Sequence, residues 1–254
     1  MRTNPGVGPG LIYRWALEGV QLVDTHAFRV MRNAFPTQLV TDLWSLCHKK
    51  YEEVAHGLVP EGYLPHVGSL PLSSVLDEPD LISLADAFAE RVQPLLANEE
   101  RNWVCNLDQA WVRRQYALNN SPKNHHPHSW HQDGALYFNF LERQPEPEDL
   151  LPMITCWLSL TDCGELAPGL ELLDLRLNRL LPPEALTHEA ICSRGKRFLR
   201  PVLNGGDLLI FDGSLLHRTY VHPGMNRDRT SVELRFFPMH ARRIKGDLLR
   251  AIKA

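Results

Sequence analysis

The sequence predicts a mainly β protein, a sandwich or barrel of short strands with a helical layer contributed by its N-terminal part. Two segments before residue 100 have apolar residues at helical spacing, and the chain after residue 102 divides into short apolar runs. Turn residues separate these runs at short intervals, which is typical of all-β architectures. We therefore expect a single domain over 1–254, with a helical layer at 1–100, a β core at 101–240 and a tail at 241–254.

The composition is that of an ordinary globular protein, with 44% hydrophobic and 22% charged residues in 254. The formal net charge of −3 gives no electrostatic reason to expect nucleic acid as a partner. Five cysteines without a Cys-x-x-Cys pair argue against a disulfide framework and against a thiolate zinc site. We find neither an apolar signal core nor a run long enough to span a bilayer, so we expect a cytoplasmic protein without membrane contact.

Two helices are expected in the first hundred residues. After a short strand at 28–31, the first helix follows Pro36, carries its apolar residues on one stripe and ends near Gly57. A loop with several prolines occupies 58–78. The second helix begins after Pro79, and its apolar face comprises Leu81, Leu84, Ala85, Phe88, Val92 and Leu95.

Short strands are expected through the rest of the chain. Their ranges are 103–108, 110–117, 153–160, 196–203, 207–211, 214–220 and 230–237. Residues 141–152 form an acidic, proline-rich insertion. Residues 242–254 are expected to form a short helix.

The stretch Ser-Trp-His-Gln-Asp-Gly at 129–134 is the first candidate for a functional site. On an extended strand, positions i and i+2 share a face, which would set the imidazole of His131 beside the carboxylate of Asp133. Two histidines and one carboxylate on one face of an octahedral ion form the usual site of non-haem Fe(II) oxygenases. Alone, the pair is weak evidence, because three further histidines at 125, 126 and 128 would also suit a solvated polar loop.

The best candidate for the second histidine is His217. An apolar run and an Asp-Gly turn precede it, which places it at the start of a late strand that could lie beside the segment of His131. His222, inside a Pro-Gly turn, and His240, beyond the last expected strand, are weaker alternatives.

The final expected strand opens with Arg229, and Ser231 alternates onto the same face. A guanidinium binds a carboxylate through paired, charge-assisted hydrogen bonds, and a hydroxyl nearby can add to them. A lone arginine in a β protein usually lies at the surface, so the position of Arg229 after the second histidine is what makes it a candidate.

These motifs, in this order, resemble the phytanoyl-CoA dioxygenase family of Fe(II)/2-oxoglutarate-dependent oxygenases. The resemblance extends from about residue 28 to 238 and has four parts: Trp-His-Gln-Asp-Gly at 130–134, Cys-Trp-Leu-Ser-Leu-Thr-Asp at 156–162, Gly-Asp-Leu-Leu-Ile-Phe at 206–211 leading to His217, and Arg229. It implies a double-stranded β-helix, or jelly roll, at 101–240 with helices on one side, in agreement with the strand pattern.

By this resemblance, His131, Asp133 and His217 would bind Fe(II), and Arg229 with Ser231 would bind the far carboxylate of 2-oxoglutarate. On the strand before the metal motif, Gln115 or Arg113 would help to hold this co-substrate. The step from His217 to Arg229 is about one residue longer than the family pattern, so Arg235 stays an alternative.

The activity that the resemblance implies is a dioxygenase reaction, in which O2 oxidises a small molecule, by hydroxylation or otherwise, while 2-oxoglutarate is decarboxylated to succinate. Asp133 favours oxygenation, because related halogenases have a small residue there. Pro-Gly-Leu-Glu at 168–171 stands where many members have Pro-Gly-Ser-His, which removes a possible histidine from the substrate pocket. We therefore expect a specialised substrate, such as one of secondary metabolism, and a monomer or homodimer.

Two other classes of function stay open. A metal-dependent lyase, isomerase or hydrolase could use the same two histidines and carboxylate with another divalent ion, and binding of 2-oxoglutarate would distinguish it. A jelly-roll binding protein that has lost turnover is the second alternative, and metal content would test it.

Overall fold

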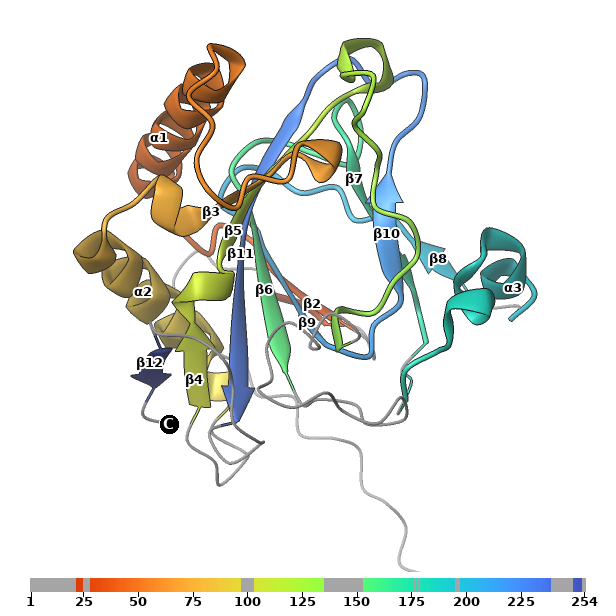
Figure 1. Ribbon diagram of the computed structural model, residues 1–254. Coiled ribbons are helices and arrows are strands. Elements are labelled where there is room, and N and C mark those ends of the chain that lie inside the picture. Colours follow the sequence, from red (N-terminus) through yellow and green to blue (C-terminus); the bar gives the residue numbers. More distant parts are fainter. Residues whose placement is uncertain are drawn as a thin grey trace, which may run out of the picture.

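Two antiparallel β-sheets form the core of the fold, and two helices cover the outer face of the larger sheet (Figure 1). The computed structural model describes residues 22–24, 28–96, 103–134, 153–175, 177, 179–194, 197–238 and 249–252. The arrangement confirms the predicted mainly β, jelly-roll architecture with a helical layer near the N-terminus.

The larger sheet has nine strands. Its path runs through β1 (Leu22–Asp24), β2 (Phe28–Met31), β9 (Leu208–Asp212), β6 (Ile154–Ser159), β11 (Arg229–Pro238), β4 (Trp103–Asn106) and β12 (Leu249–Ile252). The first half of β11 also pairs with β5 (Trp111–Gln115), and β5 pairs with β3 (Ser69–Pro71). The ten-residue strand β11 therefore connects three neighbours and lies at the centre of the sheet.

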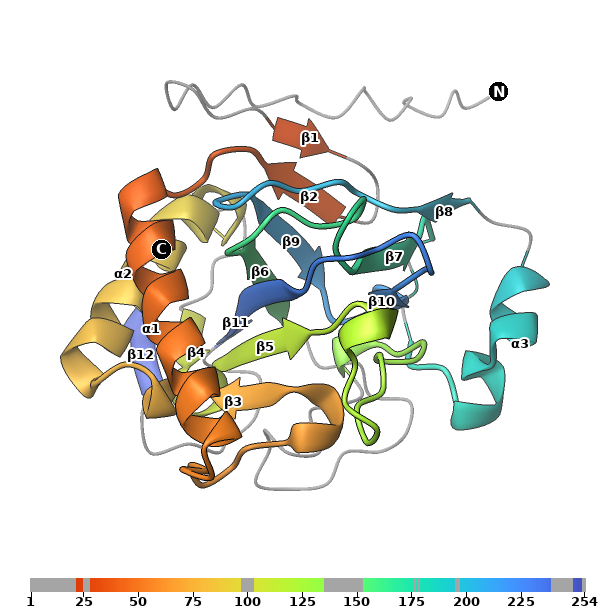
Figure 2. The same cartoon turned by 90° about the horizontal axis from the view of Figure 1, so that it is seen from above.

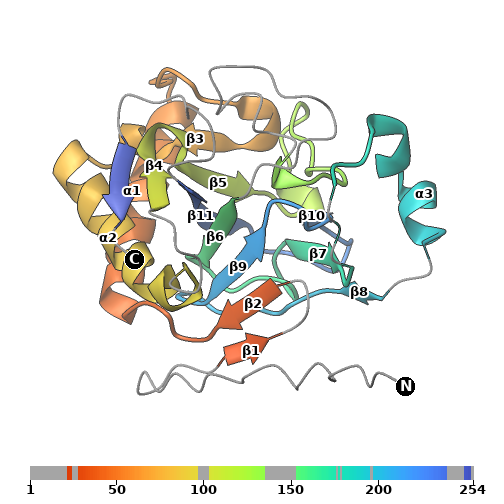
Figure 3. The same cartoon turned by 90° about the horizontal axis from the view of Figure 1, so that it is seen from below.

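The smaller sheet contains β10 (His217–Tyr220), β7 (Gly169–Leu173) and β8 (Phe198–Leu199), in that order. Seen from above and from below, it lies on the side of the larger sheet away from the helices α1 (Thr37–Ala55) and α2 (Glu78–Leu96) (Figures 2 and 3). A short helix, α3 (His188–Cys192), lies beyond it.

Both long helices are amphipathic and bury one face against the larger sheet. The buried side chains of α1 are Val40, Leu43, Cys47 and Tyr51, and they join one hydrophobic cluster with residues of α2 and of the sheet. The Tyr51 hydroxyl contacts the backbone carbonyls of Gly68 at 2.7 Å and Val112 at 3.1 Å. None of the described helices is both long and apolar enough to cross a membrane.

Strand β11 separates two different interiors. All ten of its residues are buried, and successive side chains point to opposite faces of the sheet. One face packs against the helices through Val232, Leu234 and Phe236. The other face points between the two sheets and is polar, with Arg229, Ser231, Glu233 and Arg235.

Most of the expected helices and strands are present near their expected bounds. Several segments differ from the sequence-based expectation. Residues 249–252 form strand β12, paired with β4, rather than a helix, because Ile252 packs into the core under the helices. Of the expected strand at 196–203, Phe198–Leu199 pairs with β7, and Leu203 makes an isolated bridge with Cys163. Strand β7 itself was not predicted, because its Pro-Gly start indicates a turn and its residues, all buried, do not alternate between apolar and polar. The insertion at 141–152 lies outside the described residues.

The apolar face of β11 gives a prediction about stability. Phe236 is fully buried between the sheet and the helices, so Phe236→Ala should lower the free energy of unfolding by about 3–5 kcal/mol, measured by denaturant titration. Leu46 lies on α1 with 44% of its surface exposed, and Leu46→Ala should change stability by less than about 1 kcal/mol. Equal losses for the two variants would contradict the assignment of this core.

Candidate metal centre

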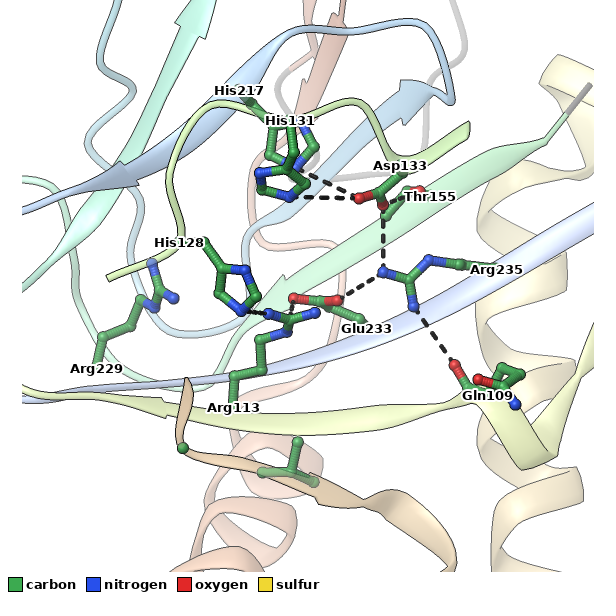
Figure 4. A network of polar contacts seen from close by, with 12 residues as sticks. Gln109, Arg113, His128, His131, Asp133, Thr155, His217, Arg229, Glu233 and Arg235 are labelled. Atoms are coloured by element: carbon green, nitrogen blue, oxygen red, sulfur yellow. Dashed lines mark hydrogen bonds and ion pairs between the residues drawn. The ribbon is translucent and has the colours of Figure 1, made fainter. Parts of the chain in front are cut away.

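Three side chains far apart in the sequence converge at one end of the space between the sheets. His131, Asp133 and His217 each offer a ligand atom, and these atoms lie within 4.8 Å of one another. The Nε2 atoms of both histidines are 3.6 Å from Asp133 Oδ1 (Figure 4). Among the residues that the structure describes, this is the one group of histidine, cysteine and acidic side chains spaced to hold a metal ion.

The backbone brings the two histidines together through a single bridge. The His131 N–H donates to the His217 carbonyl at 3.0 Å, and the His217 N–H donates to the His131 carbonyl at 3.1 Å. His131 therefore lies beside the start of β10, as expected for a neighbouring strand. The expectation of a regular strand through 131–133 was wrong, because only His131 is bridged and the chain turns at Asp133.

The protonation of each imidazole is set by a backbone carbonyl. His131 Nδ1 lies 2.7 Å from the Ser129 carbonyl, and His217 Nδ1 lies 3.0 Å from the Leu215 carbonyl. A carbonyl only accepts, so each Nδ1 carries the hydrogen and each Nε2 keeps a lone pair. Burial, followed by the neighbouring His217, lowers the pKa of His131 to about 3, which keeps this ring neutral near pH 7. Neutral imidazole is the form that binds metals.

The two oxygens of Asp133 have different environments. Oδ2 accepts hydrogen bonds from the Thr155 hydroxyl at 2.7 Å and from Arg235 Nη2 at 3.2 Å, while Oδ1 faces the histidines. Burial opposes ionisation of Asp133, but Arg235 and then His217 outweigh it and lower its pKa below the usual range. The carboxylate is thus charged and presents one oxygen. Two imidazole nitrogens and one such oxygen are the donor set that suits Fe(II) with open positions.

Beside this triad lies a pocket with both charged and apolar walls. Arg229 is 2% exposed, its Nη1 donates to the Gly169 carbonyl at 3.1 Å, and its guanidinium lies over the Trp157 ring at 5.0 Å. Burial lowers the pKa of Arg229 to about 10, so it stays cationic near pH 7. The full lining is Arg113, His128, His131, Asp133, Trp157, Leu170, Phe211, His217, Thr219, Arg229 and Glu233.

Several donors around this pocket are buried without a partner among the described residues. They are Arg229 Nε, Ser231 Oγ and Trp157 Nε1. Buried polar atoms are nearly always hydrogen-bonded in native proteins. These three donors are therefore available to a molecule that carries acceptor oxygens.

A chain of ion pairs crosses the wall opposite Arg229. Arg235 Nη2 contacts Glu233 at 3.0 Å as well as Asp133, and Glu233 Oε1 accepts from Arg113 Nε at 2.7 Å. Arg113 also contacts the ring of His128. Figure 4 shows Arg229 and Arg235 on opposite sides of this cluster. Arg235 therefore already has two carboxylate partners, whereas Arg229 has none among the residues that the structure describes.

The other candidates from the sequence have different surroundings. Gln115 is buried beside Arg229 on the paired strand, but it does not line the pocket, and its amide donates to the Tyr116 carbonyl at 3.3 Å. His222 also lies outside the pocket and accepts from the Gly224 N–H at 3.0 Å. His240 lies outside the described residues.

Leu170 and Glu171, which differ from the family motif, point to opposite faces of β7. Leu170 lines the pocket, whereas Glu171 points to the opposite face of β7. There its carboxylate is 1% exposed and pairs with Arg200 and Arg218, each at 2.5 Å. In this chain, position 170 therefore faces the pocket and position 171 does not.

Several site residues were not found from the sequence. Thr155, which holds Asp133, and Glu233, which pairs with Arg235, were not named, and Arg235 was named only as an alternative to Arg229 and not as a partner of Asp133. These residues lie on two paired strands whose register the sequence does not reveal. Trp157 and His128 were also missed. One signal was present: Arg229, Ser231, Glu233 and Arg235 alternate along the last strand, and a polar residue at every second position of a buried strand indicates a polar interior.

Known structures share this fold at low sequence identity. The α-ketoglutarate-dependent carbocyclase SnoK from nogalamycin biosynthesis is 13% identical with a TM-score of 0.59, covering 89% of this chain and 92% of SnoK. The epimerase SnoN, in complex with Fe3+, α-ketoglutarate and nogalamycin RO, is 12% identical with a TM-score of 0.60, covering 84% and 79%. HygX from Streptomyces hygroscopicus, with nickel and 2-oxoglutarate bound, is 15% identical with a TM-score of 0.55, covering 85% and 84%.

The sequence itself was compared with curated proteins and with protein families. No curated protein matches the chain. The sequence pattern of the phytanoyl-CoA dioxygenase (PhyH) family matches residues 72–223, more than half of the chain, and this range contains His131, Asp133 and His217. With the shared fold, this match shows that the chain belongs to the phytanoyl-CoA dioxygenase family.

Proposed function

We propose that this protein is a Fe(II)- and 2-oxoglutarate-dependent dioxygenase that oxidises a small organic molecule. The observation that carries the proposal is the convergence of His131, Asp133 and His217 beside a pocket whose wall holds the buried Arg229, which pairs with no carboxylate in the described part of the chain. Membership in the family supports a dependence on iron, 2-oxoglutarate and O2. When bound, these cofactors supply the oxidation of the substrate, with decarboxylation of 2-oxoglutarate to succinate.

One set of residues would bind the metal, and another would bind and orient 2-oxoglutarate. His131, His217 and Asp133 Oδ1 would hold the metal, with the imidazoles fixed by the Ser129 and Leu215 carbonyls. Arg229 would bind the far carboxylate of 2-oxoglutarate, since a buried guanidinium with an unpaired Nε needs a carboxylate partner. Trp157, which lines the pocket, and Ser231, which lies next to it on the same face of β11 as Arg229, would add hydrogen bonds to the same molecule through donors that have no partner among the described residues.

The substrate would lie against the apolar part of the pocket. Leu170 and Phe211 contribute apolar surface there, and Thr219 a hydroxyl. Low-polarity walls exclude water and strengthen the electrostatic contacts of the bound groups. SnoN is an epimerase and SnoK a carbocyclase, so analysis of the product decides whether the oxidation ends in hydroxylation or in another outcome. Their origin in nogalamycin biosynthesis supports a substrate from secondary metabolism.

Removal of any one of the three ligands tests the metal site. His131→Ala, Asp133→Ala and His217→Ala should each lose stoichiometric Fe(II) and, with it, succinate formation from 2-oxoglutarate. The control is His222→Ala, which lies outside the pocket and should keep both. Metal bound by His217→Ala but lost from His222→Ala would show that the wrong histidine is assigned.

Removal of the guanidinium tests the co-substrate site. Arg229→Ala leaves a carboxylate without its buried partner, which costs about 2–5 kcal/mol and should weaken 2-oxoglutarate binding about 30-fold or more. Calorimetric titration of the metal-loaded protein measures this, with Arg114→Ala as the control, since Arg114 pairs with Asp228 away from the pocket. Equal affinities for wild type and Arg229→Ala would refute the assignment.

Substitution of Glu171 tests which face of β7 points into the pocket. Glu171→Gln keeps the shape but loses two charge-assisted pairs, so the free energy of unfolding should fall by about 1–3 kcal/mol. Affinities for metal and 2-oxoglutarate should stay as in the wild type, because the side chain faces away from the pocket. Glu165→Gln, at an exposed position, is the control for stability. Weaker 2-oxoglutarate binding by Glu171→Gln would place this residue in the site.

A further inference from the structure

We infer that Arg235 is a positioning residue for Asp133, which holds Oδ2 of the carboxylate so that Oδ1 alone is presented to the metal. This inference rests on the proposed iron and 2-oxoglutarate chemistry. It gives Arg235 a function different from that of Arg229, although both arginines lie on the same face of β11.

The contacts of Asp133 support this function directly. Its carboxylate is 2% exposed, and Oδ2 accepts from two donors on two neighbouring strands, Thr155 on β6 and Arg235 on β11. The two donors are themselves cross-strand partners, because Arg235 pairs with Thr155 in the register of these strands. Both lone-pair directions of Oδ2 are therefore satisfied by the protein, and Oδ1 is left for the histidines.

Arg235 is itself fixed from other sides. It is 1% exposed, its Nη2 contacts Glu233 at 3.0 Å, and its Nη1 reaches the Gln109 carbonyl at 3.5 Å. Glu233 in turn is paired with Arg113. A buried arginine between two carboxylates is compensated in charge, so it can stay in the interior without being drawn toward a ligand. This arrangement leaves Arg229 as the available guanidinium for a bound carboxylate.

The number of oxygens that Asp133 presents matters for the chemistry. A facial triad leaves the opposite face of the metal open for co-substrate and O2. A carboxylate free to bind through both oxygens would occupy one of those open positions and would compete with 2-oxoglutarate. Partners that orient a metal ligand from behind commonly change metal affinity or activity about 10- to 100-fold when they are removed.

The test uses Co(II) as a spectroscopic probe in the full-length protein. The absorption spectrum of bound Co(II) reports its coordination, and 2-oxoglutarate is then titrated into each Co(II) protein. In Arg235→Gln, the freed Oδ2 should change the spectrum before 2-oxoglutarate is added and should weaken 2-oxoglutarate binding about tenfold or more. Arg235→Lys retains the charge and one donor, so its spectrum and affinity should lie nearer to those of the wild type.

Thr155→Val is a second, gentler variant that removes the other donor to Oδ2 with little change in volume. It should shift the spectrum in the same direction as Arg235→Gln, and it decides the question if loss of Arg235 prevents folding. Arg32→Lys is the matched control, because Arg32 pairs with the buried Asp207 outside the pocket, and it should leave both readouts unchanged. Arg229→Ala should weaken 2-oxoglutarate binding without changing the spectrum of the 2-oxoglutarate-free protein.

The outcomes distinguish a failure of the proposed function from a failure of the positioning function of Arg235 alone. A wild-type protein that binds neither Co(II) nor 2-oxoglutarate overturns the proposed function. A wild type that binds both, with Thr155→Val and a folded Arg235→Gln identical to it in spectrum and affinity, overturns the positioning function of Arg235 alone. A changed spectrum in the Arg235 and Thr155 variants, with an unchanged spectrum in Arg229→Ala, supports it.

Discussion

Compensation of buried charge is the constraint on which the site depends. Strand β11 buries Arg229, Glu233 and Arg235 on a face that has almost no contact with water. A charge removed from water is costly unless a counter-charge with good geometry accompanies it. Arg235 and Glu233 meet this condition within the protein, through Asp133 and Arg113. Arg229 has no carboxylate partner among the described residues, and this difference between the two arginines is the basis for assigning a bound carboxylate to Arg229 in the proposed function.

The sequence predicts those parts of the site that depend on short spacings. His131 and Asp133 are adjacent in a motif, and the apolar run before His217 places it at a strand start, so these residues could be found without coordinates. The partnership of Arg235 with Asp133 could not, because it depends on the register of β11 against β6. The helical expectation for 249–252 failed for a similar reason: pairing with the edge of β4 outweighs the local preference.

Solved structures with the same fold show how far its sequence can vary. SnoN and SnoK share the fold at 12–13% identity, so the sheets and their packing tolerate wide changes in sequence. The face of β7 that contributes Leu170 to the pocket is one place where this chain departs from the common motif. Variation there changes the shape offered to a substrate, while Glu171 on the other face keeps the smaller sheet together through Arg200 and Arg218.

Strand β12 has a consequence for how the molecule behaves in solution. It pairs with β4 through all four of its residues and is the last strand on its side of the larger sheet. Without it, the N–H and C=O groups of β4 would be open to pairing with another chain, which is how exposed sheet edges promote self-association. The last described residues of the chain therefore cover the edge of β4. A tag or truncation that disturbs Leu249–Ile252 would favour aggregation without changing the candidate metal ligands.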